Sequence, residues 1–303
     1  MILCFDIGGT TIKGAVARSA TDIDTLPRWP TPARDFSAFL AVIAEALKSL
    51  SGTVDGIAIS IAGVVDPDTR AATVANIPCI DGRDLTAEIE KAFGIPTLVA
   101  NDADCLAMAE AGIGAGQGHR IVLGAVLGTG VGGGLVVDGK LINTDGFAGE
   151  WGHGPAIAAE AGTPPVKIPA FACGCGQKGC VDTIGGARGL ERLHRLIHKV
   201  DLDSETIIAD WQAGEPKAAR TIDVYVDLVA SPLALTINIT GATIVPVGGG
   251  LSNAEPLLAA LDEAVRARTL RRFHRPLVVR GQCRIEPGLI GAAILGLKEF
   301  AGG

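Results

Sequence analysis

Three cysteines and one histidine stand close enough in the sequence to form a single chemical site: His153, Cys173, Cys175 and Cys180. Three thiols and one imidazole make a complete tetrahedral ligand set for Zn²⁺, and a closed set of this kind indicates a structural ion rather than a catalytic one. The spacing differs from that of a standard zinc finger. It also differs from the Cys-x-x-Cys of redox pairs, and a nucleophilic cysteine would need a neighbouring base. The residues alone favour zinc and leave a thiol function open.

A second candidate for chemistry is the dipeptide Asn101-Asp102. It follows the apolar run PTLVA and precedes the helical run ADCLAMAEAG. Polar groups at the carboxyl end of a strand lie where α/β proteins bind ligands, so Asp102 is placed to act as a general base for a hydroxyl. Asn and Asp are equally favoured as helix N-caps. Position alone therefore supports a base and a cap equally, whereas Asp104 fits a first-turn charge that stabilises the helix.

Three glycine-rich segments each follow an apolar strand: DIGGTT (6–11), GTGVGGG (128–134) and GGGLSN (248–253). Glycine lets backbone N–H groups approach an anion, and Thr10 and Thr129 add a hydroxyl to the first two segments. Neither is a Walker loop, since no Gly-Lys-Ser/Thr follows, and neither is a Rossmann loop, since a strand comes next. A tight hairpin would explain one such segment, but two in matching places predict phosphate binding.

The expected elements place these segments in two similar halves. Residues 2–17 read as a strand, a glycine turn and a returning strand, and residues 36–50 read as a helix. Further strands and helices alternate up to the run RIVLGAVLGTGVGGGLVVDGKLI (120–142), where the strand–turn–strand pattern restarts. This repetition at domain scale, with alternating strands and helices, predicts an α/β protein with two related halves and a ligand between them.

Composition and charge exclude several classes of protein. The chain has 303 residues, 48% of them hydrophobic and 19% charged, which indicates a globular protein with a large core or two domains. Its net charge of −7 argues against nucleic-acid binding. The N-terminus has no basic segment, and no run approaches about 18 uncharged apolar residues. We expect a cytoplasmic protein without membrane contact, without disulfides, and with four buried, inert cysteines: Cys4, Cys79, Cys105 and Cys283.

The order DIGGT, ND, GTGVGGG, CGCGQKGC and GGGLS resembles that of sugar kinases of the ROK family, within the actin/hexokinase-like superfamily. The resemblance covers essentially the whole chain. It implies an α/β fold, the two-domain actin-like ATPase fold with its duplicated ribonuclease H-like unit, and an active site in the interdomain cleft. It implies an N-terminal domain of residues 1–118, onto which a C-terminal helix at 289–303 packs, and a larger C-terminal domain of residues 119–288.

The activity implied by the resemblance is that of an ATP-dependent hexose kinase, which transfers the γ-phosphate to the 6-hydroxyl of N-acetyl-D-glucosamine. The long gap between His153 and Cys173 is most similar to the branch of bacterial N-acetylglucosamine kinases. The alternatives are N-acetylmannosamine, glucose or fructose as the substrate, or a non-catalytic sugar-binding or regulatory protein. ROK repressors carry a DNA-binding segment before the first strand, which we do not expect here. The implied cofactors are ATP, Mg²⁺ and a structural Zn²⁺, and the implied assembly is a homodimer.

The resemblance also assigns roles to individual residues. Asp102 is the catalytic base, and Zn²⁺ is bound by His153, Cys173, Cys175 and Cys180. The sugar site comprises Gly63, Asn76, Asn101, Asp102, Glu150, His153 and Asp182. The nucleotide and its Mg²⁺ are held by Asp6, Gly8, Gly9, Thr10, Lys13, Gly128, Thr129, Gly130, Gly248, Gly249, Gly250 and Leu251. For Lys13, a solvated surface lysine is the alternative.

Two positions depart from the family pattern. Asp182 stands where the family has Glu, which keeps the charge but shortens the side chain by one methylene. Ala62 precedes Gly63 where proline is common. Zinc held by His153 and Cys180 would bring Glu150 and Asp182 towards the same sugar. We therefore expect metal removal to weaken sugar binding more than ATP binding.

Overall fold

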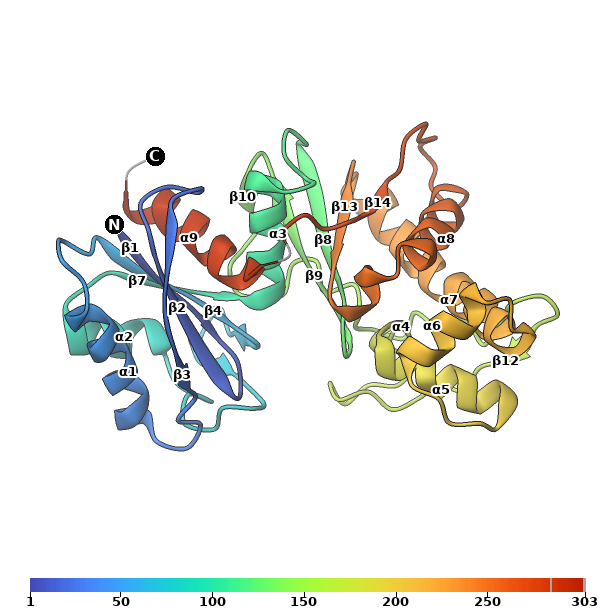
Figure 1. Cartoon of the computed structure of the whole chain (residues 1–303), viewed down its shortest axis with the longest axis horizontal. Coiled ribbons are helices and arrows are strands. Elements are labelled where there is room, and N and C mark those ends of the chain that lie inside the picture. The colour runs from blue at the N-terminus through green and yellow to red at the C-terminus, as the bar shows by residue number, and fades with distance from the viewer. Residues whose placement is uncertain (284, 302–303) are drawn as a thin grey trace. The chain divides into compact units, whose positions relative to one another are not determined.

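A computed structural model describes residues 1–283 and 285–301, which form two compact units (Figure 1). The first unit comprises Met1–Gly118, Gly134–Ala148 and the C-terminal segment from Cys283, and the second comprises His119–Gly133 and Gly149–Gln282. These units differ from the expected domains 1–118 and 119–288 chiefly at Gly134–Ala148. The physical reason is close packing: a Cβ atom on Gly134 would lie 2.8 Å from the Cα atom of Asp104, in the first unit.

The first unit contains a five-stranded sheet in the order β3-β2-β1-β4-β7. Its strands are β1 (Ile2–Ile7), β2 (Thr11–Ala17), β3 (Ile23–Pro30), β4 (Gly56–Ile61) and β7 (Thr97–Asn101), beside a small hairpin of β5 (Val64–Val65) and β6 (Ala72–Thr73). The first three strands are antiparallel, whereas β4 and β7 run parallel to β1. The register aligns Ile7 with Ile61 and Ile61 with Asn101, so the residues that follow these three positions meet at one edge of the sheet.

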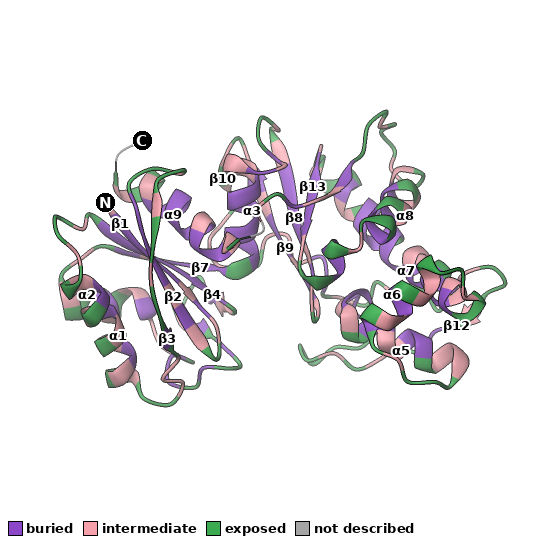
Figure 2. Ribbon diagram, in the orientation of Figure 1, coloured by how far each residue is buried: buried purple, intermediate pink, exposed green. Residues whose placement is uncertain are grey.

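Helices cover both faces of this sheet (Figure 1): α1 (Phe36–Lys48) and α2 (Leu85–Phe93) on one face, α3 (Asp102–Ile113) and α9 (Pro287–Phe300) on the other. Alternation along β1 sends Leu3, Phe5 and Ile7 into the core with α1 and α2, and turns Asp6 towards α9. Figure 2 shows β1 and β4 almost entirely buried, whereas the edge strand β3 is largely exposed, as are residues on the outward sides of α1 and α2.

The two helices α3 and α9 touch backbone to backbone, since a Cβ atom on Gly291 would lie only 2.0 Å from the carbonyl oxygen of Cys105. The buried carboxylate of Glu110 on α3 accepts hydrogen bonds from the N–H groups of Ala115 and Cys283, both at 2.8 Å. These bonds satisfy a charge that burial would otherwise make costly. Residues 302 and 303 of the helix expected at 289–303 lie outside the described residues.

The second five-stranded sheet has the order β10-β9-β8-β13-β14. Its strands are β8 (Ile121–Leu127), β9 (Val131–Val137), β10 (Lys140–Leu141), β13 (Val245–Gly248) and β14 (Val278–Arg280). When the five strands of each sheet are numbered in chain order, both sheets have the same spatial order, 3-2-1-4-5. The predicted α/β class and the repetition of two related halves are confirmed.

The helices of the second unit pack around α7. They are α4 (Asp182–Gly185), α5 (Ala187–His198), α6 (Ser204–Gln212), α7 (Pro216–Thr240) and α8 (Glu255–Arg266), with the hairpin of β11 (Glu160–Ala161) and β12 (Val166–Lys167) and a 3₁₀ turn, η1 (Gly250–Asn253). Among the described residues, α7 is the one helix long and apolar enough to cross a membrane, but 56% of its most apolar window is buried inside the protein. The buried hydroxyl of Tyr225 on α7 donates to the Gly185 carbonyl (2.7 Å), as expected of a core helix.

Candidate functional site

Asn101 and Asp102 lie at the junction of β7 and α3, and the structure gives them different roles. Asn101 is the N-cap of α3: its Oδ1 accepts hydrogen bonds from the N–H groups of Ala103 (2.8 Å) and Asp104 (3.3 Å). Its Nδ2 donates to the Gly63 carbonyl (2.8 Å), which joins the segments that follow β4 and β7. Because Asn101 caps the helix, the exposed side chain of Asp102 is not required for capping.

The carboxyl group of Asp102 holds its proton more tightly than an ordinary aspartate. The surrounding protein removes water from it and the charge of Asp6 repels its own, so its pKa rises to about 6, although the side chain still reaches solvent. A carboxylate with such a pKa is a stronger base than usual and is still mostly ionised at neutral pH. This combination suits a group that accepts a proton from a hydroxyl.

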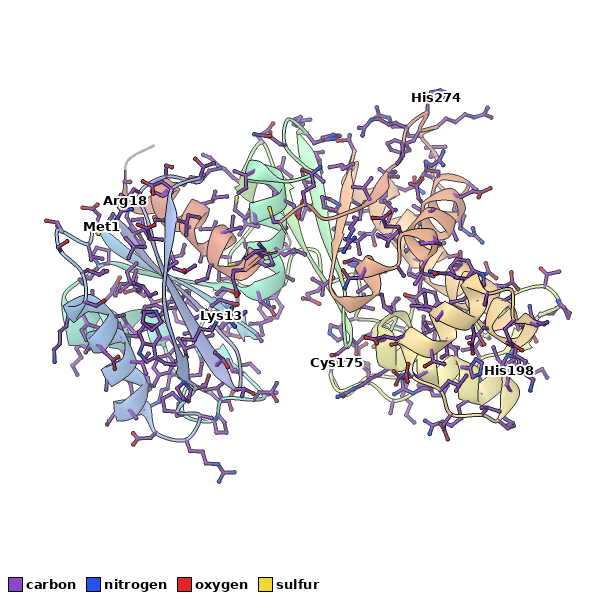
Figure 3. The ribbon with its side chains drawn as sticks, viewed as in Figure 1. Met1, Lys13, Arg18, Cys175, His198 and His274 are labelled. Carbon is purple, nitrogen blue, oxygen red and sulfur yellow. The ribbon has the colours of Figure 1, made fainter. Side chains whose placement is uncertain are left out.

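Asp6, near the end of β1, lies in a network of charges that the sequence did not reveal. Ser60 Oγ donates to its Oδ1 (3.2 Å), and Lys13 Nζ lies 3.0 Å from its Oδ2 and 2.7 Å from Glu286 Oε2. Arg28 pairs with the other oxygen of Glu286 at 2.7 Å. Burial opposes the charge of Lys13, but its hydrogen bonds and attraction to Glu286 and Asp6 outweigh that cost and raise its pKa. Lys13 (Figure 3) is therefore an ion-paired lysine rather than a solvated one.

The first glycine turn is braced by its neighbours. Thr31 Oγ1 donates to the Gly8 carbonyl (2.6 Å), and the N–H of Thr31 donates to the carbonyl of Thr10 (2.9 Å). A Cβ atom on Gly9 would lie 2.9 Å from the Cβ atom of Asn76, so this predicted sugar-binding residue sits against the turn. Gly8 and Gly9 have no side chains that would keep an anion from the backbone of the turn, and the N–H of Gly8 also donates to the Thr11 carbonyl (3.0 Å), which closes the turn.

The second and third glycine segments meet in the second unit. Gly249 follows β13 with φ of 86°, and a Cβ atom there would lie 2.5 Å from the carbonyl oxygen of Leu127. A Cβ atom on Gly186, before α5, would lie 2.5 Å from the carbonyl oxygen of Thr129. Ala187 N–H donates to the Gly128 carbonyl (2.8 Å). The segment 128–130, which we call the phosphate loop after the role that the sequence predicts for it, is thus packed against the backbone at Gly249 and at Gly186-Ala187, where side chains on the glycines would collide with it.

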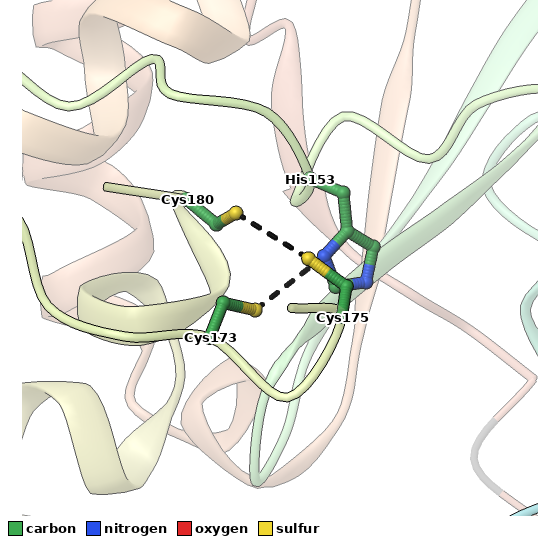
Figure 4. Close-up of side chains that lie close together, drawn as sticks. All are labelled: His153, Cys173, Cys175 and Cys180. Carbon is green, nitrogen blue, oxygen red and sulfur yellow. Dashed lines mark hydrogen bonds between the residues drawn. The ribbon is translucent and has the colours of Figure 1, made fainter. Parts of the chain in front are cut away.

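The four sulfur and nitrogen ligands converge in the second unit (Figure 4). One potential ligand atom from each of His153, Cys173, Cys175 and Cys180 lies within 4.8 Å of all the others. Cys173 Sγ is 3.7 Å from His153 Nδ1, and Cys175 Sγ is 3.7 Å from Cys180 Sγ. Cys175 lies on an exposed turn (Figure 3), whereas Cys180 is fully buried. Gly176 and Gly179 have φ of 88° and 76°, which lets the chain turn tightly between the thiols.

This donor set fits zinc. Separations of 3.7 Å between donor atoms are those of a tetrahedron with zinc–ligand bonds of about 2.0–2.3 Å. Burial raises the pKa of the Cys173 thiol to about 12, so that thiol needs the charge of a cation to ionise at neutral pH. His153 turns Nδ1 towards the thiols, and its Nε2 lies 3.8 Å from Glu150 Oε2. A carboxylate behind a metal-binding histidine is a common arrangement that fixes the ring orientation.

Asp182 has contacts other than those expected of a sugar ligand. Its Oδ1 accepts a hydrogen bond from the N–H of Val131 (2.8 Å), the residue that follows the phosphate loop, and Cys173 Sγ donates to its Oδ2 (3.5 Å). The backbone N–H of Asp182 donates to the Gly152 carbonyl (2.9 Å), next to His153.

The structure brings the predicted residues into two groups, one in each unit. The first unit contains Asp6, Gly8, Gly9, Thr10, Lys13, Gly63, Asn76, Asn101 and Asp102, and the second contains Gly128, Thr129, Gly130, Glu150, His153, the three cysteines, Asp182 and Gly248 to Leu251. Sequence reasoning missed Ser60 and Glu286, which contact Asp6 and Lys13. Ser60 could have been found from the sequence, since it is a hydroxyl within an otherwise apolar strand. No local feature of the sequence pointed to Glu286.

Two related α/β halves, each with a glycine turn after its first strand, and an aspartate at a helix start are the features expected of the actin- and hexokinase-like kinases. The comparisons narrow this class. The family model described as "ROK family" matches residues 2–299. An N-acetylgalactosamine kinase from Shewanella sp. (strain ANA-3) is 34% identical over 301 residues, 98% of this chain and 97% of that one. An N-acetyl-D-glucosamine kinase from Pasteurella multocida (strain Pm70) is 33% identical over 306 residues, 97% and 99% of the two chains.

Among solved structures, a ROK hexokinase from Thermus thermophilus has a TM-score of 0.85 and 29% sequence identity, and the match covers 100% of this chain and 99% of that one. The chain belongs to the ROK family. These relatives confirm the predicted class, an ATP-dependent sugar kinase. N-acetylgalactosamine, the substrate named for the Shewanella relative, was not among the sugars that the sequence analysis considered.

Proposed function

We propose that the chain transfers the γ-phosphate of ATP to the 6-hydroxyl of N-acetyl-D-glucosamine, with Asp102 as the general base. The observation that carries this proposal is the division of labour at the start of α3: Asn101 caps the helix, and Asp102 is left with a raised pKa beside Asp6. A sugar hydroxyl is a weak acid, and a positioned carboxylate accepts its proton as the phosphoryl group is transferred.

In this proposal the glycine turns hold the nucleotide. The N–H groups of Gly8 to Thr10 and of the phosphate loop bind its phosphates, and Gly248 to Leu251 lies against the adenosine. Asp6 orients Mg²⁺, which when bound with ATP neutralises charge on the transferring phosphate. Lys13 helps to position Asp6 through their ion pair rather than by contacting phosphate.

The sugar and metal sites are proposed from the remaining residues. Gly63, Asn76, Glu150 and His153 supply donors and acceptors for sugar hydroxyls, and Asn101 contributes through the one amide hydrogen that its three observed bonds leave over. The cysteines and His153 Nδ1 bind a structural Zn²⁺ that holds His153 and, through it, Glu150 in place. We propose further that the protein is cytoplasmic and forms a homodimer, for which the exposed Leu235 and Ile239 on α7 offer apolar surface.

The choice of sugar is tested by measuring kcat/KM with ATP for N-acetylglucosamine, N-acetylgalactosamine, N-acetylmannosamine, glucose and fructose. A site built to hydrogen-bond an N-acetyl group discriminates against sugars that lack it, so we expect N-acetylglucosamine to exceed glucose by about tenfold or more. A tenfold preference for glucose or for N-acetylgalactosamine would overturn the choice of substrate. Absence of turnover with all five sugars would overturn the kinase proposal itself.

The pH dependence follows from the pKa of Asp102. The base must be ionised to accept a proton, and its pKa is about 6. We expect kcat/KM for the sugar to be level near pH 8 and to fall about tenfold per pH unit well below pH 6. The measurement is an initial-rate series at saturating ATP, with circular dichroism to verify folding at each pH. A level profile down to pH 5 in folded protein would exclude Asp102 as the titrating base.

A further inference from the structure

Asp182 connects three segments of the second unit. Its Oδ1 accepts from Val131 N–H at 2.8 Å, Cys173 Sγ donates to its Oδ2 at 3.5 Å, and its backbone N–H donates to the Gly152 carbonyl at 2.9 Å. Asp182 is the first residue of the short helix α4, and its side chain is only partly exposed. Oδ1 is therefore engaged on the phosphate-loop side, and the backbone N–H anchors Asp182 next to the metal ligand His153. The Cys173 contact requires a protonated thiol, so it belongs to the metal-free protein and not to one in which Cys173 binds zinc as a thiolate.

The carboxylate of Asp182 packs tightly against the phosphate loop. A Cβ atom on Gly130 would lie 2.2 Å from Asp182 Oδ1, so the carboxylate sits directly against the loop backbone. The N–H of Val131 is the first donor of β9 after the loop, and its bond to a charged acceptor fixes where the loop ends. A glutamate, one methylene longer, could not place its carboxylate at this position without moving the loop or α4.

We propose that Asp182 is a positioning residue for the nucleotide, which ties the Cys/His cluster to the phosphate loop. The inference rests on the proposed function, since it requires that this loop bind ATP. It reassigns Asp182 from the sugar to the nucleotide. It also adds a nucleotide effect to the sugar effect expected from metal removal, because Asp182 is held next to His153 through the Gly152 carbonyl and holds Val131 through its Oδ1.

The test compares Asp182→Ala, Asp182→Asn and Asp182→Glu with wild type. Titration calorimetry measures the Kd for a non-hydrolysable ATP analogue with Mg²⁺, and steady-state kinetics measures KM for ATP and for the sugar separately. The matched control is Asp201→Ala, since Asp201 is an exposed acidic residue of the same unit that pairs with Arg195 on the surface. Zinc content and circular dichroism are measured for each protein.

A hydrogen bond to a charged group corresponds to roughly a ten- to hundredfold change in an equilibrium constant. We expect Asp182→Ala to raise the Kd and KM for the nucleotide by about that factor, with little change in KM for the sugar. Asp182→Asn should restore most of the affinity, because its Oδ1 still accepts from Val131 N–H, whereas Asp182→Glu should not. Chelation of the metal should weaken nucleotide binding in wild type more than in Asp182→Ala.

Equal nucleotide affinity in wild type and all three variants would overturn this role. So would a rise in sugar KM alone, which is the result expected of a sugar ligand. If Asp182→Ala does not fold, the proposal is tested by comparing the other two variants. It requires the Asp182→Asn protein to bind the nucleotide more tightly than the Asp182→Glu protein does. A wild-type protein that binds no nucleotide would instead overturn the proposed function, and this inference with it.

Discussion

Replacement of Asp102 by Asn should reduce kcat for sugar phosphorylation by about 10²–10⁴-fold, the usual contribution of a general base. Asn has the shape of Asp and can still hydrogen-bond a sugar hydroxyl, but it cannot accept the hydroxyl proton. The Kd for the sugar should therefore change little, and the loss should appear in kcat rather than in KM. The capping bonds of Asn101 do not involve the Asp102 side chain, so α3 should be preserved.

The same substitution should not destabilise the protein at pH 8. The pKa of Asp102 is about 6 in the folded protein and near 4 in an unfolded chain, so the folded state binds the proton more tightly. Stability from this group is therefore complete at low pH and is lost as the pH rises through about 4 to 6. The substitution by Asn removes the charge and with it this loss of stability, although solvent screening at the exposed side chain makes the stabilisation smaller. We expect Asp102→Asn to melt at or above the wild-type temperature at pH 8, with the difference shrinking towards pH 5.

Asp84→Asn is the matched control, because Asp84 caps α2 in the same unit and Asn is an equally good cap. It should leave kcat unchanged. Wild-type turnover in Asp102→Asn would show that another group accepts the proton. A marked drop in melting temperature at pH 8 would show instead that Asp102 has a structural role.

The parts of this fold that could be predicted from sequence are those that depend on local pattern. Apolar strands that run into glycine turns predicted the two hairpins at Gly8-Gly9 and at the phosphate loop, and helix α1 followed from the spacing of its apolar residues. Helices were also expected at α3 and α9. The return of the C-terminal helix to the first unit was expected from the family resemblance alone. Nothing in the local sequence shows that Gly291 allows α9 to touch α3 at Cys105.

The chemistry of the site depended on contacts that sequence position does not determine. Asp102 could be read as a cap or as a base, and only the bonds of Asn101 to Ala103 and Asp104 separated these readings. Lys13 could be read as a solvated surface residue or as a phosphate ligand, and the sequence did not show that Glu286 reaches it from the far end of the chain. Such long-range pairs follow from the fold and carry no local signal.

Asp182 is another residue whose contacts could not be predicted from its sequence position, because its side chain is one methylene shorter than the Glu of the family. The resemblance placed it at the sugar because the family has Glu at this position. In the structure the shorter side chain reaches Val131 and the thiol of Cys173 instead. The contact between Asp182 Oδ1 and Val131 N–H depends on the fold and on the length of this side chain, so it could not be predicted from the position of Asp182 in the sequence.

Replacement of Cys180 by Ser should remove the metal and lower the stability of the protein substantially. Cys180 is the fully buried member of the Cys/His cluster, and its sulfur lies 3.7 Å from that of Cys175. A ligand present at a thousandfold its Kd stabilises the folded state by about 4 kcal/mol, and structural zinc sites bind at least this tightly. For a unit of this size that corresponds to a fall in melting temperature of about 10 °C.

The measurements are metal analysis by mass spectrometry, a thermal melt with and without chelator, and KM for sugar and nucleotide. Wild type should contain close to one zinc per chain, and the chelator should lower its melting temperature to nearly that of Cys180→Ser. Cys283→Ser is the control, because Cys283 lies in the other unit, outside the cluster, and should keep its zinc and its melting temperature. Wild-type protein without zinc, or a chelator effect equally large in Cys180→Ser, would contradict a structural metal. If zinc is present, its removal should raise both KM values. His153 connects the metal to Glu150, and the Gly152 carbonyl next to His153 holds Asp182, which in turn holds the phosphate loop at Val131.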